Sequence, residues 1–517
     1  MERKRLTKGK IKWIERTVET DRSYKVIVYN RAIASILLLL INLALTVALL
    51  MVSDFVWAWH WVAAALAVLA VLYLTGREQR RPTRTLWIIL LLTVPLVGLS
   101  LYLLYGDGKT NVRMMGKLKR ARKKLTDAQP AIQEGGQGEM ETLLSSYGYN
   151  AYTDGDVSFY PTGKELFAAM KEALQGAKEY ILMEFFILSG GKMWKELLTI
   201  LLRKAEEGVK IKLIYDDFGS IFSLPPRYAN YLESLHPNIE CLAFNKVYPI
   251  FSASYNHRDH RKILVVDGRT AFTGGVNIAD EYIDEKKRFG YWKDTGVRIC
   301  GGGALGLARI FLEMWIAFKD PELDPAPYLS GKIAQKTGEL AIPFADDPLS
   351  DARVSESVFL QMISSAKERL YITTPYLVLD ETLRAALCLA AMRGVDVRII
   401  TPGIPDKKLV YRLTRANYDA LLKAGVRIYE YTPGFLHAKQ TLSDGSAAVG
   451  TTNYDYRSLY LHFENMLYFQ GGGAVQEVER DFQELFLISK ERTLADTKRN
   501  FFGRAFDTLL RIFEPLL

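Results

Sequence analysis

Cysteine is scarce in this chain of 517 residues, and histidine is hardly more common, with six. The three cysteines, Cys241, Cys300 and Cys388, are odd in number, and none belongs to a Cys-x-x-Cys pair. A disulfide framework and a cysteine zinc cluster are therefore not indicated, and a reducing compartment suits the chain. We expect neither a metal nor another cofactor.

Excess positive charge is lacking in the long C-terminal part of the chain. Residues 1–124 hold 22 Lys and Arg against 7 Asp and Glu, a net charge of +15. Because the whole chain carries +9, residues 125–517 carry −6. Proteins that bind nucleic acid usually present a basic surface on their folded part. We therefore expect no nucleic-acid partner.

Charged residues are absent from three apolar runs near the N-terminus, residues 32–52, 55–75 and 86–105. Each run is long enough to cross a bilayer as a helix. A cleaved signal peptide is not expected, because 31 polar, basic residues precede the first run. The sequence therefore predicts N-terminal transmembrane helices and a multi-pass protein of the cell membrane.

Lys and Arg flank all three apolar runs, with ten in residues 1–31, four in 76–85 and eight in 106–124. If all three runs cross the membrane, the positive-inside rule cannot be satisfied throughout. Either the third run, which contains Pro95 and Gly98, is kinked and re-entrant or interfacial, or residues 106–124 lie outside against anionic headgroups. The sequence leaves both arrangements open.

The chain repeats itself beyond residue 156. Short β-type runs alternate with helical patterns, which predicts an α/β fold. The run YILMEFFIL from residue 180 returns as YITTPYLVL from 371, Gly208 returns as Gly394, and GGGAL at 301 returns as GGGAV at 471. The offsets of 191, 186 and 170 fall along the chain, as expected for two tandem copies of one domain.

These patterns divide the chain into six parts. The parts are a basic N-terminal segment (1–31), a membrane region (32–105), a basic segment and linker (106–156), a first repeat domain (157–345), a second repeat domain (346–490) and an amphipathic C-terminal tail (491–517). The tail has aromatic and leucine residues at helical spacing among arginines, so it either lies on the membrane surface or packs on the body.

Each copy carries the same polar residues at matching places. A histidine and a lysine stand two residues apart, an aspartate-glycine pair follows, and a glycine and an asparagine come after it. The residues are His260, Lys262, Asp267, Gly274 and Asn277 in the first copy, and His437, Lys439, Asp444, Gly450 and Asn453 in the second.

The spacing of these residues has a physical meaning. His and Lys two apart on a strand point to the same face, and Asp-Gly then turns the chain into a hairpin. Two copies brought together would surround one phosphate with two imidazoles, two ammonium groups and two amides. That charge is enough to stabilise a pentacoordinate transition state without a metal. Asp267 and Asp444 are either part of this chemistry or only hold the turns.

The paired motifs resemble the phospholipase D superfamily. The apolar N-terminal runs, together with ITTPYLV from residue 372 and GTTNYDYRSL from residue 450, resemble bacterial cardiolipin synthases. The resemblance implies two tandem phospholipase D-like domains related by a pseudo-twofold axis, with mixed sheets flanked by helices. One departure is Gly275, which stands where the family often has Ser.

The resemblance also implies a reaction and its residues. A phosphatidyl group would pass from one phosphatidylglycerol to another through a phosphohistidine, giving cardiolipin and glycerol. His260 would be the nucleophile and His437 the acid and then the base, although the pseudo-symmetry permits the reverse. Lys262, Lys439, Asn277 and Asn453 would bind phosphate oxygens, Thr451 would add a hydroxyl, and Asp294 and Glu464 resemble acids that orient the histidines.

Two further expectations concern the substrate. The partners are phosphatidylglycerol, cardiolipin and other membrane lipids. The alternative is a membrane-anchored phosphodiesterase of the phospholipase D type that hydrolyses phospholipid or, less favoured, nucleic acid. Transfer needs a pocket that excludes water, and the candidates for its wall are Tyr248, Phe251, Tyr255, Tyr431 and Phe435.

Overall fold

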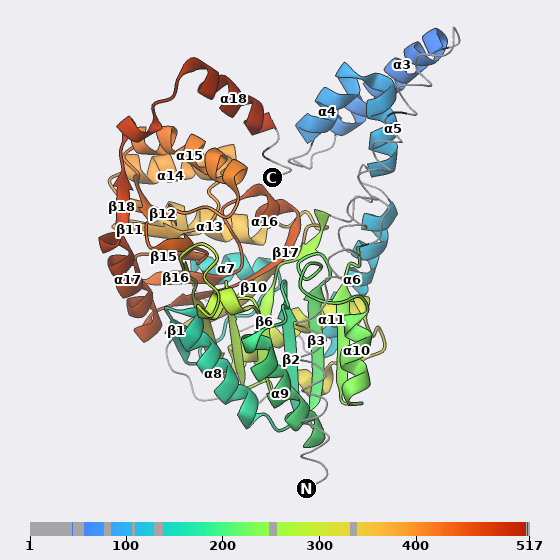
Figure 1. Cartoon of the computed structure of the whole chain (residues 1–517), viewed down its shortest axis with the longest axis vertical. Coiled ribbons are helices and arrows are strands. Elements are labelled where there is room, and N and C mark those ends of the chain that lie inside the picture. The colour runs from blue at the N-terminus through green and yellow to red at the C-terminus, as the bar shows by residue number, and fades with distance from the viewer. Residues whose placement is uncertain are drawn as a thin grey trace.

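The computed structural model describes residues 44, 56–76, 84–105, 109–128, 138–247, 256–330, 339–512 and 514. Almost all of the first apolar run, residues 32–52, and the whole basic segment 1–31 lie outside the described residues. Figure 1 shows a body of two α/β halves, with a group of N-terminal helices standing away from it at one end.

The N-terminal helices pack on one another through a small apolar cluster. They are α3 (Val56–Gly76), α4 (Arg84–Thr93) and α5 (Pro95–Tyr105). Ala67, Leu74 and Leu91 form the centre of the cluster. In the part of the chain that the structure describes, no helix combines the length and the apolar character that crossing a membrane requires.

The third apolar run is divided, as its proline suggested. Helix α4 ends at Thr93, and α5 begins at Pro95, whose ring nitrogen cannot donate a hydrogen bond. A Cβ atom at Gly98 would lie 2.5 Å from the carbonyl oxygen of Leu90, so the tight approach of α5 to α4 requires glycine here.

Two helices lie in the stretch expected to be a basic segment and linker. Helix α6 (Lys109–Ala128) packs on α11 (Gly302–Phe318) through Leu118, Ala121 and Leu125. Its Arg122 pairs with Glu313 at 2.9 Å and with Asp347 at 2.5 Å. Helix α7 (Glu139–Ser146) buries Met140 and Leu144 in the core of the second half. This part of the chain is therefore folded onto the body, because its apolar residues recur at helical spacing.

The first half is a seven-stranded mixed sheet. Its central strands are buried on both faces, which explains their continuous apolar sequences. In spatial order the strands are β1 (Val157–Tyr160), β9 (Gly296–Cys300), β7 (Thr270–Gly274), β6 (Lys262–Val266), β2 (Tyr180–Phe185), β3 (Lys210–Asp216) and β4 (Ile239–Phe244). The helices of this half are α8 (Gly163–Gly176), α9 (Lys192–Glu206), α10 (Tyr228–Leu235) and α11.

The second half repeats this strand order, which confirms the two tandem copies. Its order is β10 (Leu340–Asp346), β17 (His462–Gln470), β16 (Ser446–Gly450), β15 (Gln440–Ser443), β11 (Arg369–Thr373), β12 (Asp396–Pro402), β13 (Arg427–Tyr431) and the added edge strand β18 (Ser489–Arg492). The helices are α13 (Val354–Ser365), α14 (Glu381–Met392), α15 (Lys408–Lys423), α16 (Tyr456–Tyr460) and α17 (Gly472–Leu487).

The second sheet includes strands on both sides of residues 346–490, the range expected for the second repeat domain. Strand β10 pairs antiparallel with β17, so the second sheet begins at Leu340 and not at residue 346. Strand β18 pairs with β13, so the second sheet reaches residue 492 and the tail begins after it. Beyond it, the tail holds helix α18 (Phe501–Ile512).

The two halves exchange short strands where they meet. Strand β5 (Arg258–Asp259), just before the first motif, pairs with β17 of the second half. Strand β14 (Gly434–Leu436), just before the second motif, pairs with β8 (Tyr291–Lys293) of the first half. Each motif therefore begins on a strand that is held by the opposite half.

Candidate active site

The two motif histidines lie at the junction of the halves. His260 follows β5, and its backbone N–H donates to the carbonyl of Phe463 at 2.9 Å. His437 follows β14, and its N–H donates to the carbonyl of Lys293 at 2.8 Å. Both residues are 8% exposed. These backbone bonds cross the junction, so both imidazoles are fixed by the contact between the halves.

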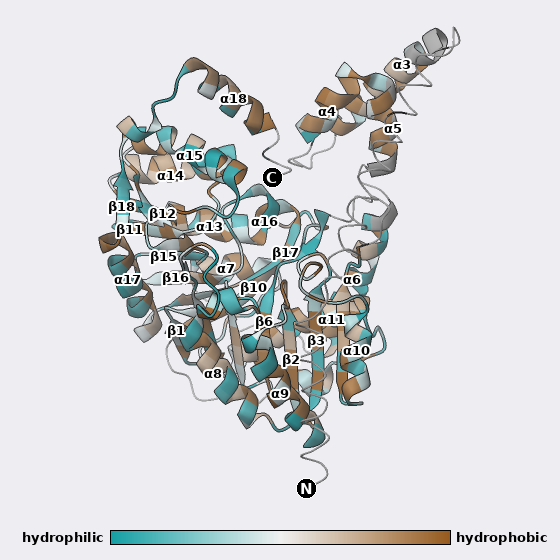
Figure 2. Cartoon of the chain, viewed as in Figure 1, coloured by the Kyte–Doolittle hydropathy of each residue, from teal (hydrophilic) through white to brown (hydrophobic). Residues whose placement is uncertain are grey.

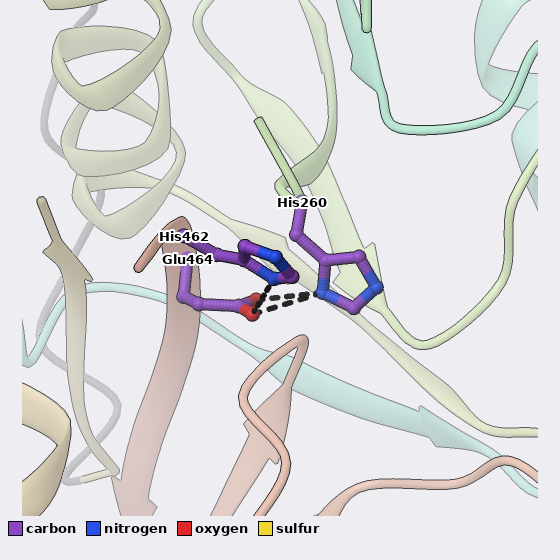
Figure 3. Close-up of side chains that lie close together, drawn as sticks. All are labelled: His260, His462 and Glu464. Carbon is purple, nitrogen blue, oxygen red and sulfur yellow. Dashed lines mark hydrogen bonds and ion pairs between the residues drawn. The ribbon is translucent and has the colours of Figure 1, made fainter. Parts of the chain in front are cut away.

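Each imidazole is bound by a carboxylate of the opposite half. His260 Nδ1 lies 2.9 and 3.0 Å from the two oxygens of Glu464, at the start of β17 (Figure 3). His437 Nδ1 lies 2.7 Å from Oδ2 of Asp294, between β8 and β9. A carboxylate accepts, so each Nδ1 carries the proton and each Nε2 is left with its lone pair. Both acids were expected to orient the motif histidines. The sequence did not predict that each acid binds the histidine of the opposite half.

The two motif lysines lie beside both histidines. Lys262 Nζ donates to the carbonyl of His260 at 2.6 Å, and Lys439 Nζ donates to the carbonyl of His437. Each ammonium group has further N–H donors for an anion. Lys262 and Lys439 both lower the pKa of each motif histidine. The structure thus brings the four side chains into one site.

Burial sets the electrostatics of this site. It lowers the pKa of His260 and His437 well below the ordinary value, with the two lysines adding to the effect. Burial also lowers the pKa of Lys262 to about 8 and of Lys439 to about 7, although nearby carboxylates act the other way on both. It raises the pKa of Asp294 to about 7. Burial therefore disfavours every charge in the site, and a bound phosphodiester anion would favour the charged form of both lysines.

The motif aspartates lie away from the histidines, at the hairpin turns. Asp267 accepts from the backbone N–H groups of residues 178, 179 and 180 at 2.8, 2.8 and 2.9 Å. Asp444 accepts from residues 367, 368 and 369 at 2.9, 3.1 and 3.0 Å. Burial works against the charge of Asp444, but these three bonds outweigh it and lower its pKa. The geometry favours the second of the two roles considered, in which both aspartates hold the turn against the next strand.

The motif amides and the threonine are mostly bound to protein groups. Asn277 accepts from the N–H of Ile187 at 3.0 Å and donates to the hydroxyl of Tyr282 at 2.7 Å. Asn453 donates to Asp455 at 3.2 Å, and within the described residues its Oδ1 has no hydrogen-bond partner. Thr451 donates to Glu464 at 2.5 Å. Its hydroxyl therefore supports the carboxylate that holds His260.

Gly275 is explained by the carboxylate of the first half. A Cβ atom at Gly275 would lie 2.0 Å from Oδ1 of Asp294. Serine at this position would therefore require Asp294 to move away from His437. The departure from the family pattern matches the space that this acid occupies.

Aromatic rings stand around both histidines. The ring of Phe186 lies 5.0 Å from that of His260, and the rings of Tyr282, Trp292 and Phe435 lie 5.5, 5.6 and 5.8 Å from that of His437. Of the expected wall, only Phe435 makes such a contact among the described residues. Tyr431 is buried in the core, and Tyr248, Phe251 and Tyr255 lie outside the described residues.

Two polar neighbours were missed by the sequence reasoning. His462 Nδ1 lies 3.6 Å from Glu464, and burial lowers its pKa to about 3. The spacing His462-x-Glu464 on a strand, which puts both side chains on one face, was the available signal. Lys407, in the loop before α15, lowers the pKa of both His260 and His437. No motif spacing connects it to either histidine.

One set of side chains has the spacing of a metal site. The donor atoms of His260, His462 and Glu464 lie within 4.8 Å of one another (Figure 3). However, Lys262 and Lys439 act electrostatically on His260, and the same positive charge disfavours a cation. The two lysines therefore disfavour a metal ion at this set of donors.

Comparisons with known proteins show which families the chain resembles. Residues 170–287 and 359–486 match the family model described as cardiolipin synthase, PLD-like domain, and residues 62–106 match the phospholipase D-nuclease N-terminal model. The cardiolipin synthase of Halalkalibacterium halodurans is 32% identical over 508 residues, covering 93% of this chain and 99% of that protein. An uncharacterized protein of Streptococcus mutans is 37% identical over 465 residues, covering 87% and 99%.

A solved structure shares the fold at low identity. The phosphatidylserine synthase of Haemophilus influenzae superposes with a TM-score of 0.55 at 15% identity, covering 73% of this chain and 98% of that one. The two matched domain models and the relatives that are 32% identical over 88% and 93% of the chain place the sequence in one family. The chain belongs to the cardiolipin synthase family of the phospholipase D superfamily.

Proposed function

We propose that the chain transfers a phosphatidyl group from one phosphatidylglycerol to another, giving cardiolipin and glycerol. The observation that carries this proposal is the pair of imidazoles, each with Nδ1 bound to a carboxylate of the opposite half and both beside Lys262 and Lys439. Two imidazoles whose Nδ1 atoms are held by carboxylates can supply, through Nε2, a nucleophile and a proton carrier for one phosphate.

In the first step His260 Nε2 attacks phosphorus and the bond to the glycerol headgroup breaks. The phosphodiester is an anion, so its binding raises the pKa of His437, whose Nε2 takes up a proton from solvent and then gives it to the leaving oxygen. Lys262 and Lys439 bind the non-bridging oxygens, with the remaining N–H groups of Asn277 and Asn453 as further donors. The product of this step is a phosphohistidine and free glycerol.

In the second step His437 acts as a base. It takes the proton from the terminal hydroxyl of a second phosphatidylglycerol, and that oxygen attacks phosphorus and releases His260. The acceptor brings an anion of its own, and Lys407 is a further cation close enough to act on both histidines. The rings of Phe186, Tyr282, Trp292 and Phe435 exclude water beside the imidazoles, which favours the lipid alcohol as acceptor.

The N-terminal part is proposed to hold this site at the membrane. Apolar residues of α3, including Trp61, Leu69 and Leu72, are each about 60% exposed, which suits contact with lipid. We propose that the apolar runs 32–52, 55–75 and 86–105 together anchor the chain at the bilayer, with the broken third run, α4 and α5, lying at the interface.

The test is to supply the purified enzyme with vesicles of phosphatidylglycerol alone and to identify both products. Equal amounts of cardiolipin and glycerol are expected. Phosphatidic acid as the dominant product would mean that water is the acceptor, and the chain would then be a hydrolase of the same superfamily.

A further inference from the structure

The C-terminal helix α18 is fixed to the body by one face. Leu510 packs with Val410 and Leu413. Asp507 accepts from Arg412 at 2.5 Å and pairs with Arg499 at 3.0 Å. These contacts hold α18 against α15, so the helix presents a constant face to solvent.

That outward face is apolar and aromatic. Phe501 and Phe502 are 78% and 80% exposed, and Phe506, Leu509 and Ile512 are also exposed. The surface of a soluble protein rarely exposes so many large apolar side chains on one short helix. Helices of this kind bind membranes by burying the apolar face at the boundary of headgroups and acyl chains.

A basic cavity lies between α18, α15 and the turn that precedes α18. Its volume is about 450 Å³. The lining includes two acids, Asp419 and Asp507, and six basic residues, Arg415, Lys423, Lys498, Arg499, Arg504 and Arg511.

Within the described residues, three of the basic side chains of the cavity form no ion pair, so their positive charge is available to bind an anion. Arg504 and Arg511 donate to backbone carbonyls, those of Arg499 and Ala416. For these two and for Lys498, the described part of the chain provides no carboxylate at ion-pair distance. The cavity therefore has net positive charge and suits a phosphate group.

The position of α18 is consistent with a membrane contact. Figure 1 shows α18 at the same end of the molecule as α3–α5, and Figure 2 shows apolar residues on both. A bilayer that contacts the N-terminal helices would therefore lie at the end of the molecule that carries α18.

We propose that α18 and the cavity behind it form a second lipid site, which binds the surface of a bilayer that contains anionic phospholipid. The aromatic face enters the headgroup boundary, and the cavity takes the phosphate of an anionic headgroup. This site is separate from the two motif histidines and does not depend on the reaction proposed for them. It gives the second half of the enzyme a membrane contact of its own.

The test measures hydrogen exchange of residues 498–512 in the full chain, reconstituted in lipid nanodiscs. One set contains phosphatidylcholine alone, the other phosphatidylcholine with phosphatidylserine, whose charge is supplied without the substrate of the proposed reaction. Exchange is expected to be about tenfold slower in the anionic nanodiscs. The double variant Lys498→Ala/Arg504→Ala should lose this difference, and Phe501→Ser/Phe502→Ser should lose protection in both sets.

Matched controls make each outcome decisive. Lys178→Ala/Lys210→Ala removes two exposed lysines of the first half and should leave the protection unchanged. Equal exchange in both lipid sets would overturn the role of the cavity. Protection by inorganic phosphate in detergent, without a bilayer, would show a site for a soluble anion and would overturn the lipid proposal. Because turnover is not measured, failure of the proposed reaction would leave this result intact.

Discussion

His260 and His437 share one site, yet each belongs to a different repeat. Each repeat alone provides one imidazole and one ammonium group, and a two-step transfer needs a nucleophile and a proton carrier together. We expect His260→Ala and His437→Ala each to lower turnover by at least about a thousandfold. His236→Ala, in a loop of the first half, is the matched control and should keep normal activity. Near-normal turnover in either motif variant would contradict the shared site.

The acids behind the histidines give a second prediction. Glu464 accepts the Nδ1 proton of His260, so Glu464→Gln leaves the shape but removes the charge that fixes this tautomer. We expect turnover to fall about a hundredfold or more, with a similar loss for Asp294→Asn. Steady-state kinetics on phosphatidylglycerol vesicles measure this loss. If both variants turned over normally, the carboxylates would not be needed to orient the imidazoles.

The lysines predict the response of the enzyme to alkaline pH. The pKa of Lys439 is lowered to about 7 and that of Lys262 to about 8, so both ammonium groups lose their proton as pH rises through this range. The phosphate then loses its cations, and kcat/KM, which reports on the free enzyme, should fall between about pH 7 and 9. The histidines do not cause this fall, because burial lowers their pKa and both are neutral in the free enzyme over this range. A flat profile to pH 9 would contradict the assignment.

At the scale of elements, the motif aspartates belong to the hairpins. Asp267 is the first residue of the turn between β6 and β7, where φ is 52° at Asp267 and 62° at Gly268. Its carboxylate binds three backbone N–H groups at the start of β2. We expect Asp267→Ala to lower the free energy of unfolding by about 1–3 kcal/mol, measured by denaturant unfolding. Turnover per folded molecule should be unchanged, and a loss of kcat at full folding would return Asp267 to the chemistry.

Some of the structural elements could be predicted from the sequence, and others could not. The two copies were predictable because buried parallel strands give continuous apolar runs, and the same runs return with matching glycines. The break at Pro95 was predictable because proline has no N–H. Helix α6 was taken as part of a basic segment, since its many Lys and Arg hid the spacing of Leu118, Ala121 and Leu125.

The rest of the site depends on contacts between elements far apart in sequence. Glu464 and Asp294 could be selected from their place after each motif, but not their crossed partners, which β5 and β14 set by pairing with the opposite half. Lys407 reaches the histidines only through the packing of the loop between β12 and α15. Such contacts join residues that are far apart in the sequence and follow no regular spacing, so they could not be predicted before the fold was known.

At the scale of the whole molecule, the N-terminal helices should matter for bilayers more than for chemistry. A lipid phosphate lies at headgroup depth, and an anchored site needs no long excursion to reach it. Deleting residues 1–105 should therefore reduce activity on vesicles more than on dispersed short-chain phosphatidylglycerol. Deleting residues 1–31 alone keeps the apolar runs and serves as the control. An equal loss on both substrates would mean that the deleted part supports the catalytic body itself.

The crossed pairing of histidine and carboxylate also bears on how such a chain can change over generations. If each repeat held a complete site of its own, either repeat could change without affecting the other. Here the acid encoded in one repeat serves the base encoded in the other. A substitution at Asp294 removes the hydrogen bond to His437, and one at Glu464 removes the bond to His260. A change in either repeat therefore alters the histidine of the other. The two copies are inherited as a single functional unit.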